Sequence, residues 1–342
     1  MRRQGSARRP PAAVAPVRSE EELLRAVAGF RAARVILSAF ELGFFTALGA
    51  GERDARRVAA RTGTEERAAE RLLNALCALG LVRKRGGRFR NALLARLRLV
   101  AGRPGYLAGL GHSAAQWRTW SMLSAAVRRG RATTVRPAAR GDRARRSGFI
   151  AAMHQRARLQ APRIVAQLDL ARTRRCLDIG AGSGAYAIAL CRASAALRVT
   201  AFDLPAVIPL TRGYVRRAGL LRRVDFRAGD FRRGGFGPGY DLVLLSAIVH
   251  MNGAEQNRRL IARAAAALAP GGQLVVQDFI MDRGRTRPAA GAFFALNMLV
   301  ATAGGDSYTA GEIATWMRAA GLKRIRRVAT PYDAALMIGW KE

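Results

Sequence analysis

A run from Arg174 to Gly184, Arg-Arg-Cys-Leu-Asp-Ile-Gly-Ala-Gly-Ser-Gly, constrains the fold of this chain more than any other segment. Its first half is typical of a buried strand. The alternating glycines Gly180, Gly182 and Gly184 are typical of a turn that opens a helix. Because glycines place no side chain between backbone and ligand, a cofactor can lie directly against the chain. The run therefore predicts an α/β unit that binds a nucleotide or a related cofactor.

Two acidic residues stand where such a cofactor would meet the turn. Asp178 lies at the end of the predicted strand, and Asp203 ends the next strand-like run, 19 residues past Gly184. That spacing is close to the one at which an acid meets a ribose in βαβ nucleotide folds. The glycines also fit the dinucleotide pattern G-x-G-x-x-A. The carboxylate inside the strand end favours S-adenosylmethionine, whose ammonium needs a carboxylate and which has no pyrophosphate to seat on the helix end.

Length and composition exclude several classes of protein. The chain has 342 residues, half of them hydrophobic, which is enough for two domains, but it has no run of eighteen apolar residues. We therefore expect no membrane partner, and a disordered basic tail over residues 1–18. Three cysteines without C-x-x-C spacing and three histidines argue against a metal site. Reduced thiols fit a cytoplasmic location.

The net charge of +36 could attract nucleic acid. Lysine occurs only at positions 84, 323 and 341, however, so arginine supplies 56 of the 59 basic residues. This preference for arginine over lysine indicates a general compositional bias spread over the surface. Nucleic acid is therefore the less favoured partner. The densest block, residues 128–146, is expected to be a solvated connector.

The pattern of apolar residues divides the chain into three further segments. Residues 19–104 combine helical spacing over 20–48, 54–61 and 65–80 with a basic hairpin around Gly86 and Gly87, a winged-helix pattern in which a dimer clamp is favoured over DNA binding. Residues 105–170 predict a helical connector in which Trp117 and Trp120 pack. Residues 171–342 alternate strands and helices, which predicts a doubly wound α/β sheet.

In their order along the chain, these segments and motifs resemble the S-adenosylmethionine-dependent O-methyltransferases of the caffeate, hydroxyindole and bacterial polyketide type. The likeness covers residues 20–342 and implies a class I, Rossmann-like methyltransferase sheet behind an N-terminal, mostly helical winged-helix dimerisation domain. The motifs that carry it are Leu177–Gly184, Phe202–Pro205, Ala228–Phe231, Asp241–His250 and Pro270–Gly272.

The resemblance also implies roles for individual residues. His250 matches the family's catalytic base, and Asp278 matches the acid that supports it. A neutral histidine suits removal of a phenolic or enolic proton, and a carboxylate on its far nitrogen would fix the tautomer. The implied cofactor residues are Asp178, Gly180, Gly182, Gly184, Asp203, Leu204, Asp230, Phe231 and Ser246. The implied acceptor pocket contains Met153, His154, Phe294 and Met298. The implied assembly is a homodimer that acts on a small-molecule acceptor.

Three positions depart from the family's usual pattern. The His-Asp-Trp string reads His-Met-Asn from His250, and the Glu-Arg-Thr string reads Ser-Tyr-Thr from Ser307, so that Asp306 stands one residue early as a substitute acid. Ser246 stands where a basic residue is often found.

These departures leave other functions open: transfer to carbon or nitrogen, transfer to nucleic acid, or a non-catalytic cofactor-binding DNA-binding or dimer-partner protein. No Asn/Asp-Pro-Pro-aromatic string or Pro-Cys nucleophile supports a nucleic-acid substrate.

Overall fold

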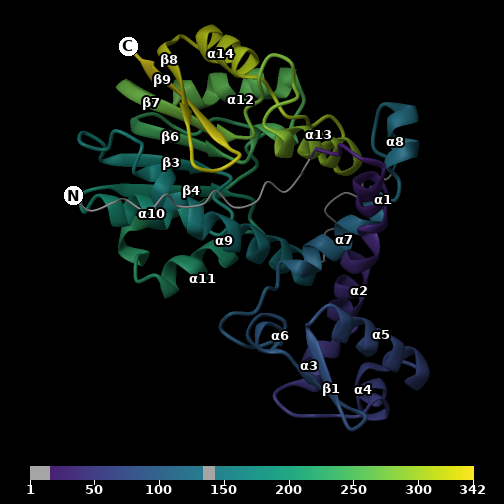
Figure 1. Cartoon of the computed structure of the whole chain (residues 1–342). Coiled ribbons are helices and arrows are strands. Elements are labelled where there is room, and N and C mark those ends of the chain that lie inside the picture. The colour runs from purple at the N-terminus through teal and green to yellow at the C-terminus, as the bar shows by residue number, and fades with distance from the viewer. Residues whose placement is uncertain (1–15, 134–142) are drawn as a thin grey trace, which may run out of the picture.

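The N-terminal part of the computed structural model consists of short amphipathic helices and one hairpin (Figure 1). The structure describes residues 16–133 and 143–342, so the predictions for the tail over 1–18 and the connector over 128–146 fall partly outside the described residues. The elements of this part are α1 (Glu20–Ala28), α2 (Phe30–Glu41), α3 (Phe44–Leu48), α4 (Ala55–Thr62), α5 (Glu66–Ala78), β1 (Val82–Arg85), β2 (Arg88–Asn91) and α6 (Leu93–Arg98).

The helical spacing over residues 20–48 belongs to three helices and not to one continuous helix. Gly29 separates α1 from α2, and Gly43, with a φ of 76°, begins α3 from the left-handed region that glycine favours. The predicted hairpin is confirmed. Gly86 and Gly87 both have positive φ and connect β1 to β2, in which Arg85 pairs with Arg88.

Apolar side chains of this part fall into a buried set and an exposed set. Phe44, Phe45 and Phe89 are among those that form a closed core. Helices α1 and α6 instead leave large apolar side chains in solvent, each at least 47% exposed: Leu23, Leu24, Val27, Leu93, Leu94 and Leu97. An exposed apolar surface of this kind is typical of a protein–protein interface.

Three helices connect this part to the sheet: α7 (Leu110–Trp120), α8 (Leu123–Arg129) and α9 (Arg143–Val165). Helix α7 packs on α2, on α9 and on α13 (Ala289–Ala301), and therefore joins the two parts of the molecule (Figure 1).

The second half of the chain forms one seven-stranded sheet in the order β5-β4-β3-β6-β7-β9-β8. All neighbours pair in parallel except β9, which is antiparallel to both of its neighbours. The strands are β3 (Arg175–Ile179), β4 (Arg198–Asp203), β5 (Val224–Ala228), β6 (Tyr240–Ser246), β7 (Leu268–Asp278), β8 (Leu322–Ala329) and β9 (Ala335–Lys341).

Both faces of this sheet are covered, as the nearly continuous apolar runs of its inner strands, such as β6 and β9, require. Leu242 and Leu244 of β6 face a core shared with α9, α10 (Ala185–Ala193) and α11 (Ile208–Arg217). Val243 and Leu245 face the opposite core, shared with α12 (Ala254–Ala266) and α14 (Ala310–Ala319). The predicted doubly wound α/β architecture is confirmed.

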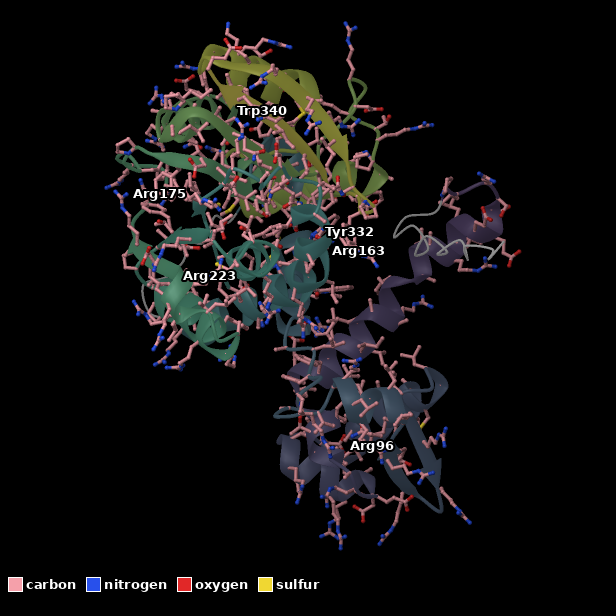
Figure 2. The ribbon with its side chains drawn as sticks, turned by 90° about the vertical axis from the view of Figure 1, so that its left-hand side faces the viewer. Arg96, Arg163, Arg175, Arg223, Tyr332 and Trp340 are labelled. Carbon is pink, nitrogen blue, oxygen red and sulfur yellow. The ribbon has the colours of Figure 1, made fainter. Side chains whose placement is uncertain are left out.

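Several of the many arginines have structural contacts (Figure 2). Arg223 donates to the backbone carbonyls of Cys191, at 2.8 Å, and Leu197, at 2.6 Å. The guanidinium of Arg175 lies over the ring of Tyr240, 5.2 Å from its centroid. Among the described residues, no helix has the length and apolarity needed to cross a membrane.

Candidate active site

The predicted cofactor residues, with His250 and Asp278, lie at or just beyond the carboxyl ends of five adjacent parallel strands, β5, β4, β3, β6 and β7. The predicted acceptor residues lie on two helices instead, Met153 and His154 on α9 and Phe294 and Met298 on α13. The chain moves outward from β3 to β5 and then returns to β6 on the other side of β3. This reversal of direction makes the β3–β6 edge a topological switch point, where ligands bind in open α/β sheets.

The glycine loop follows β3 and is shaped by the absence of side chains. Gly180 and Gly184 have φ of 73° and 72°, and a Cβ on Gly180 would lie 2.2 Å from Ile248 Cδ1. A Cβ on Gly182 would meet nothing closer than 3.9 Å. Gly182 therefore faces open space, where a ligand can approach the backbone, whereas Gly180 is needed for packing against the β6 side.

Asp203 at the end of β4 holds this loop in place. One of its carboxylate oxygens accepts a hydrogen bond from Gly182 N at 2.7 Å, and the other accepts one from Leu204 N at 2.7 Å. Burial raises the pKa of Asp203. Each oxygen retains a second lone pair, so the carboxylate can still accept hydrogen bonds from a ligand hydroxyl.

Asp178 is the least satisfied polar group of the site. Its side chain is 2% exposed, and its Oδ2 has no hydrogen-bond partner among the described residues. Burial, together with the nearby Asp203 carboxylate, raises the pKa of Asp178 to about 7. A buried carboxylate with one unpartnered oxygen fits a cationic ligand group, and the methionyl ammonium of S-adenosylmethionine is such a group.

The other predicted cofactor residues lie around this loop and differ in their exposure and in the side chains that they already contact. Leu204 is exposed just beyond β4, and Phe231 is half-buried beyond β5. Asp230 is paired with Arg232 at 2.7 Å, which lowers the pKa of Asp230. Ser246 donates to Gln277 Oε1 at 2.6 Å, so its hydroxyl hydrogen is already engaged within the sheet.

His250 and Asp278 form a close pair at the ends of β6 and β7. His250 Nδ1 lies 2.9 Å from both carboxylate oxygens of Asp278. The carboxylate also accepts from Phe279 N at 2.8 Å and from His250 N at 3.3 Å. With Nδ1–H donated to the carboxylate, the lone pair of the ring is on Nε2. The side chain of His250 is 12% exposed, and that of Asp278 4%.

An aromatic wall stands beside this pair. The Phe294 ring meets the His250 ring edge-on, at 4.7 Å and 89°, and its centroid lies 4.7 Å from that of Phe279. Met298 is buried one turn further along α13, and Met153 is half-buried on α9. Flat rings and flexible methionines suit an apolar, planar ligand.

Asp306 contacts His250 through the backbone. Asp306 N donates to His250 O at 3.0 Å, whereas the Asp306 carboxylate is paired with Arg285 at 3.0 Å. Arg285 also binds Glu312, at 2.6 Å. Ser307 donates to Gly291 O at 2.9 Å and so ties this loop to α13.

His154 lies on the cofactor side of the site. Its Nδ1 is 2.9 Å from Ser183 Oγ in the glycine loop, and its ring stacks on Tyr214 at 4.1 Å. Burial, followed by the charges of Arg158 and Arg217, lowers the pKa of His154 to about 4, so it is neutral at physiological pH.

Sequence reasoning missed one polar cluster near the wall. Asn297 Oδ1 accepts hydrogen bonds from Gln116 Nε2 and from Trp120 Nε1, both at 3.0 Å. These bonds fix the orientation of the amide. One signal was available, because Asn297 is the single polar side chain of α13, a helix that is otherwise apolar.

Comparisons with known proteins agree with this geometry. The O-methyltransferase domain matches residues 120–323, and the O-methyltransferase dimerisation domain matches residues 24–101. A 3-hydroxy-5-methyl-1-naphthoate 3-O-methyltransferase of Streptomyces sahachiroi is 36% identical over 318 residues, 90% of this chain and 91% of the relative. The tetracenomycin polyketide synthesis 8-O-methyl transferase TcmO of Streptomyces glaucescens is 31% identical over 334 residues, 95% of this chain and 98% of the relative.

Among solved structures, PigF with SAH superposes with a TM-score of 0.84 at 26% identity, covering 95% of this chain and 100% of PigF. The matched dimerisation domain supports assembly as a homodimer. The fold, the domain matches and the relatives agree: the chain is an enzyme that uses S-adenosylmethionine, and it belongs to the O-methyltransferase family.

Proposed function

We propose that this enzyme methylates a hydroxyl group of a small aromatic acceptor, with His250 as the general base. The observation that carries the proposal is the His250–Asp278 pair beyond the ends of β6 and β7, with Nδ1 2.9 Å from the carboxylate. When bound, S-adenosylmethionine supplies a methyl group on a positively charged sulfur and leaves as S-adenosylhomocysteine.

Each residue of the pair has a distinct task. Nε2 of His250 accepts the proton of the acceptor hydroxyl as the oxygen forms its bond to the methyl carbon. Asp278 holds the ring in the required tautomer and stabilises the imidazolium that results. Base catalysis of this kind contributes roughly 10²- to 10⁴-fold.

The remaining binding residues divide between the two ligands. We assign the cofactor to Asp178, the glycine loop, Asp203 and the residues that follow β4, β5 and β6. We assign Phe294, Met298 and Met153 to the acceptor, whose hydroxyl would align with His250 beside the Phe294 ring, and such alignment supplies much of the remaining rate. The names of the relatives support an aromatic acceptor, because one acts on a hydroxynaphthoate and another in the synthesis of a polyketide.

The test uses S-adenosylmethionine labelled in its methyl group with three acceptors: 3-hydroxy-1-naphthoic acid, its methyl ester and N-acetylserotonin. We expect label in the organic extract, on oxygen by NMR of the product. Label on carbon or nitrogen would contradict the proposed reaction. Label recovered only in RNA or protein when cell extract is added would contradict the small-molecule acceptor.

A further inference from the structure

We propose that Arg156 binds a carboxylate of the acceptor, so that the acceptor of this enzyme is a hydroxyaryl carboxylic acid. The inference rests on the proposed function above and goes beyond it, because it assigns a charge to the acceptor and a specificity-determining residue to this chain.

Arg156 is placed beside the aromatic wall of the site. Its guanidinium carbon lies over the ring of Phe279, 4.9 Å from the centroid. Phe279 directly follows Asp278 and contacts Phe294, whose ring in turn meets His250. On α9, Arg156 is three residues after Met153, and two residues at this spacing share a helix face.

The charge of Arg156 is not neutralised by the protein. Helix α9 contains no acidic residue, and the positions three and four residues away from Arg156 are held by Ala152, Met153, Leu159 and Gln160. Within the described ranges, no ion pair joins its guanidinium to a carboxylate, and its side chain is exposed. The carboxylate beside Phe279, that of Asp278, is already engaged by His250.

Tyr186, a polar group on the sheet side, does not supply a negative charge to Arg156. Tyr186 lies close enough to interact electrostatically with Arg156, but its hydroxyl donates to Gln277 Oε1 at 3.2 Å. Burial raises the pKa of Tyr186 to about 12, so the phenol is uncharged at neutral pH.

The guanidinium of Arg156 is free to bind an anionic acceptor, because the Asp278 carboxylate is already shared with His250. A planar guanidinium pairs with a carboxylate through two parallel hydrogen bonds, so it would both attract and orient an acidic acceptor against the wall.

Other arginines of the described chain also lie over aromatic rings, for example Arg175 over Tyr240 and Arg326 over Trp340. Those rings belong neither to the aromatic wall beside His250 nor to the residues that follow β7. The position of Arg156 therefore separates it from the general arginine content of the surface.

The experiment measures affinity without turnover. The protein is loaded with S-adenosylhomocysteine and titrated by calorimetry with 3-hydroxy-1-naphthoic acid and with its methyl ester. We expect wild type to bind the acid roughly 10- to 100-fold more tightly than the ester, the range that a hydrogen bond to a charged group gives. Arg156→Gln should lose this preference and bind the acid as weakly as the ester. Arg156→Lys should retain part of it.

The matched control is Arg163→Gln, an exposed arginine two turns along the same helix (Figure 2). It should behave as wild type. An equal loss of acid and ester binding in Arg156→Gln, or a wild type that does not distinguish them, would overturn the inference. Weaker binding of S-adenosylhomocysteine in Arg156→Gln would assign the guanidinium to the methionyl carboxylate and would also overturn it. Binding of neither aromatic compound to the loaded wild type would contradict the proposed function itself.

Discussion

Replacing Asp178 by Asn tests whether the ionised, buried carboxylate of Asp178 destabilises the folded protein until a cationic ligand binds. The pKa of this carboxyl rises from 3.8 to about 7 in the folded protein, because burial and the Asp203 carboxylate disfavour its ionised form. The unfolded chain releases the proton near pH 4, and the folded chain releases it near pH 7. The folded state therefore holds the extra proton between these values, and wild-type stability falls as the pH rises through that window.

The size of the effect follows from the two pKa values. Ionising the buried carboxyl costs about 4 kcal/mol at pH values above both of them. Between pH 5 and pH 7 alone, wild type should lose about 2 kcal/mol of unfolding free energy on this account. Asn cannot ionise, so the free energy of unfolding of Asp178→Asn should rise relative to that of wild type by about that amount between pH 5 and pH 7.

Urea denaturation followed by circular dichroism measures this directly. Both proteins are freed of copurified cofactor and unfolded at pH 5, 6, 7 and 8. Asp225, an exposed aspartate on β5, provides the control, because Asp225→Asn should change the free energy of unfolding by a similar amount at each pH. Parallel plots of unfolding free energy against pH for wild type and Asp178→Asn would show that the buried carboxylate does not destabilise the fold when it ionises. A second consequence is that S-adenosylmethionine should bind wild type more tightly as the pH rises through 7.

Three further predictions concern the loop, the acceptor wall and the dimer. Gly180→Ala forces a Cβ to within 2.2 Å of Ile248, so we expect a loss of about 1–3 kcal/mol in urea unfolding and weaker cofactor binding. Gly182→Ala meets no close atom but has a φ of 56°, so it should lose less stability than Gly180→Ala and should also weaken cofactor binding. Trp120→Phe removes one of the two donors to Asn297, and should raise the acceptor KM several-fold without changing S-adenosylhomocysteine affinity in calorimetry. Leu24→Asp places a charge on the exposed apolar surface of α1 and should shift sedimentation at micromolar concentration toward monomer.

The sheet was predictable from sequence because its inner strands are short apolar runs that alternate with helical segments. The predicted alternation of strands and helices over residues 171–342 is present, and the Gly-Gly hairpin lies where expected. The continuous helical pattern over residues 20–48 concealed two breaks. The break at Gly43 depends on a left-handed conformation, which an apolar periodicity does not register.

Within the site, motif position predicted which strand end each residue would occupy, but not what its side chain would contact. Asp230 is held by Arg232, Ser246 by Gln277, and the Asp306 carboxylate by Arg285. These pairings depend on side chains brought in from loops and neighbouring strands, and a chain with so many arginines offers too many equivalent partners for the sequence to specify one.

The acceptor side was the hardest to predict for a related reason. His154 and Arg156 are two residues apart on α9, yet one contacts the glycine loop and the other the wall beside Asp278. Side chains of successive residues on a helix point about 100° apart around its axis. Which residue faces the glycine loop and which faces the wall therefore depends on how α9 is rotated against the sheet.

The most direct test of the account compares wild type with His250→Ala and Asp278→Asn, measuring S-adenosylhomocysteine affinity by calorimetry and single-turnover methyl transfer to a hydroxynaphthoate. If His250 is the base, both variants should bind S-adenosylhomocysteine within about twofold of wild type, and His250→Ala should transfer methyl roughly 10²- to 10⁴-fold more slowly, with a smaller loss for Asp278→Asn. Methyl transfer at the wild-type rate by His250→Ala would contradict the assignment of His250 as the base.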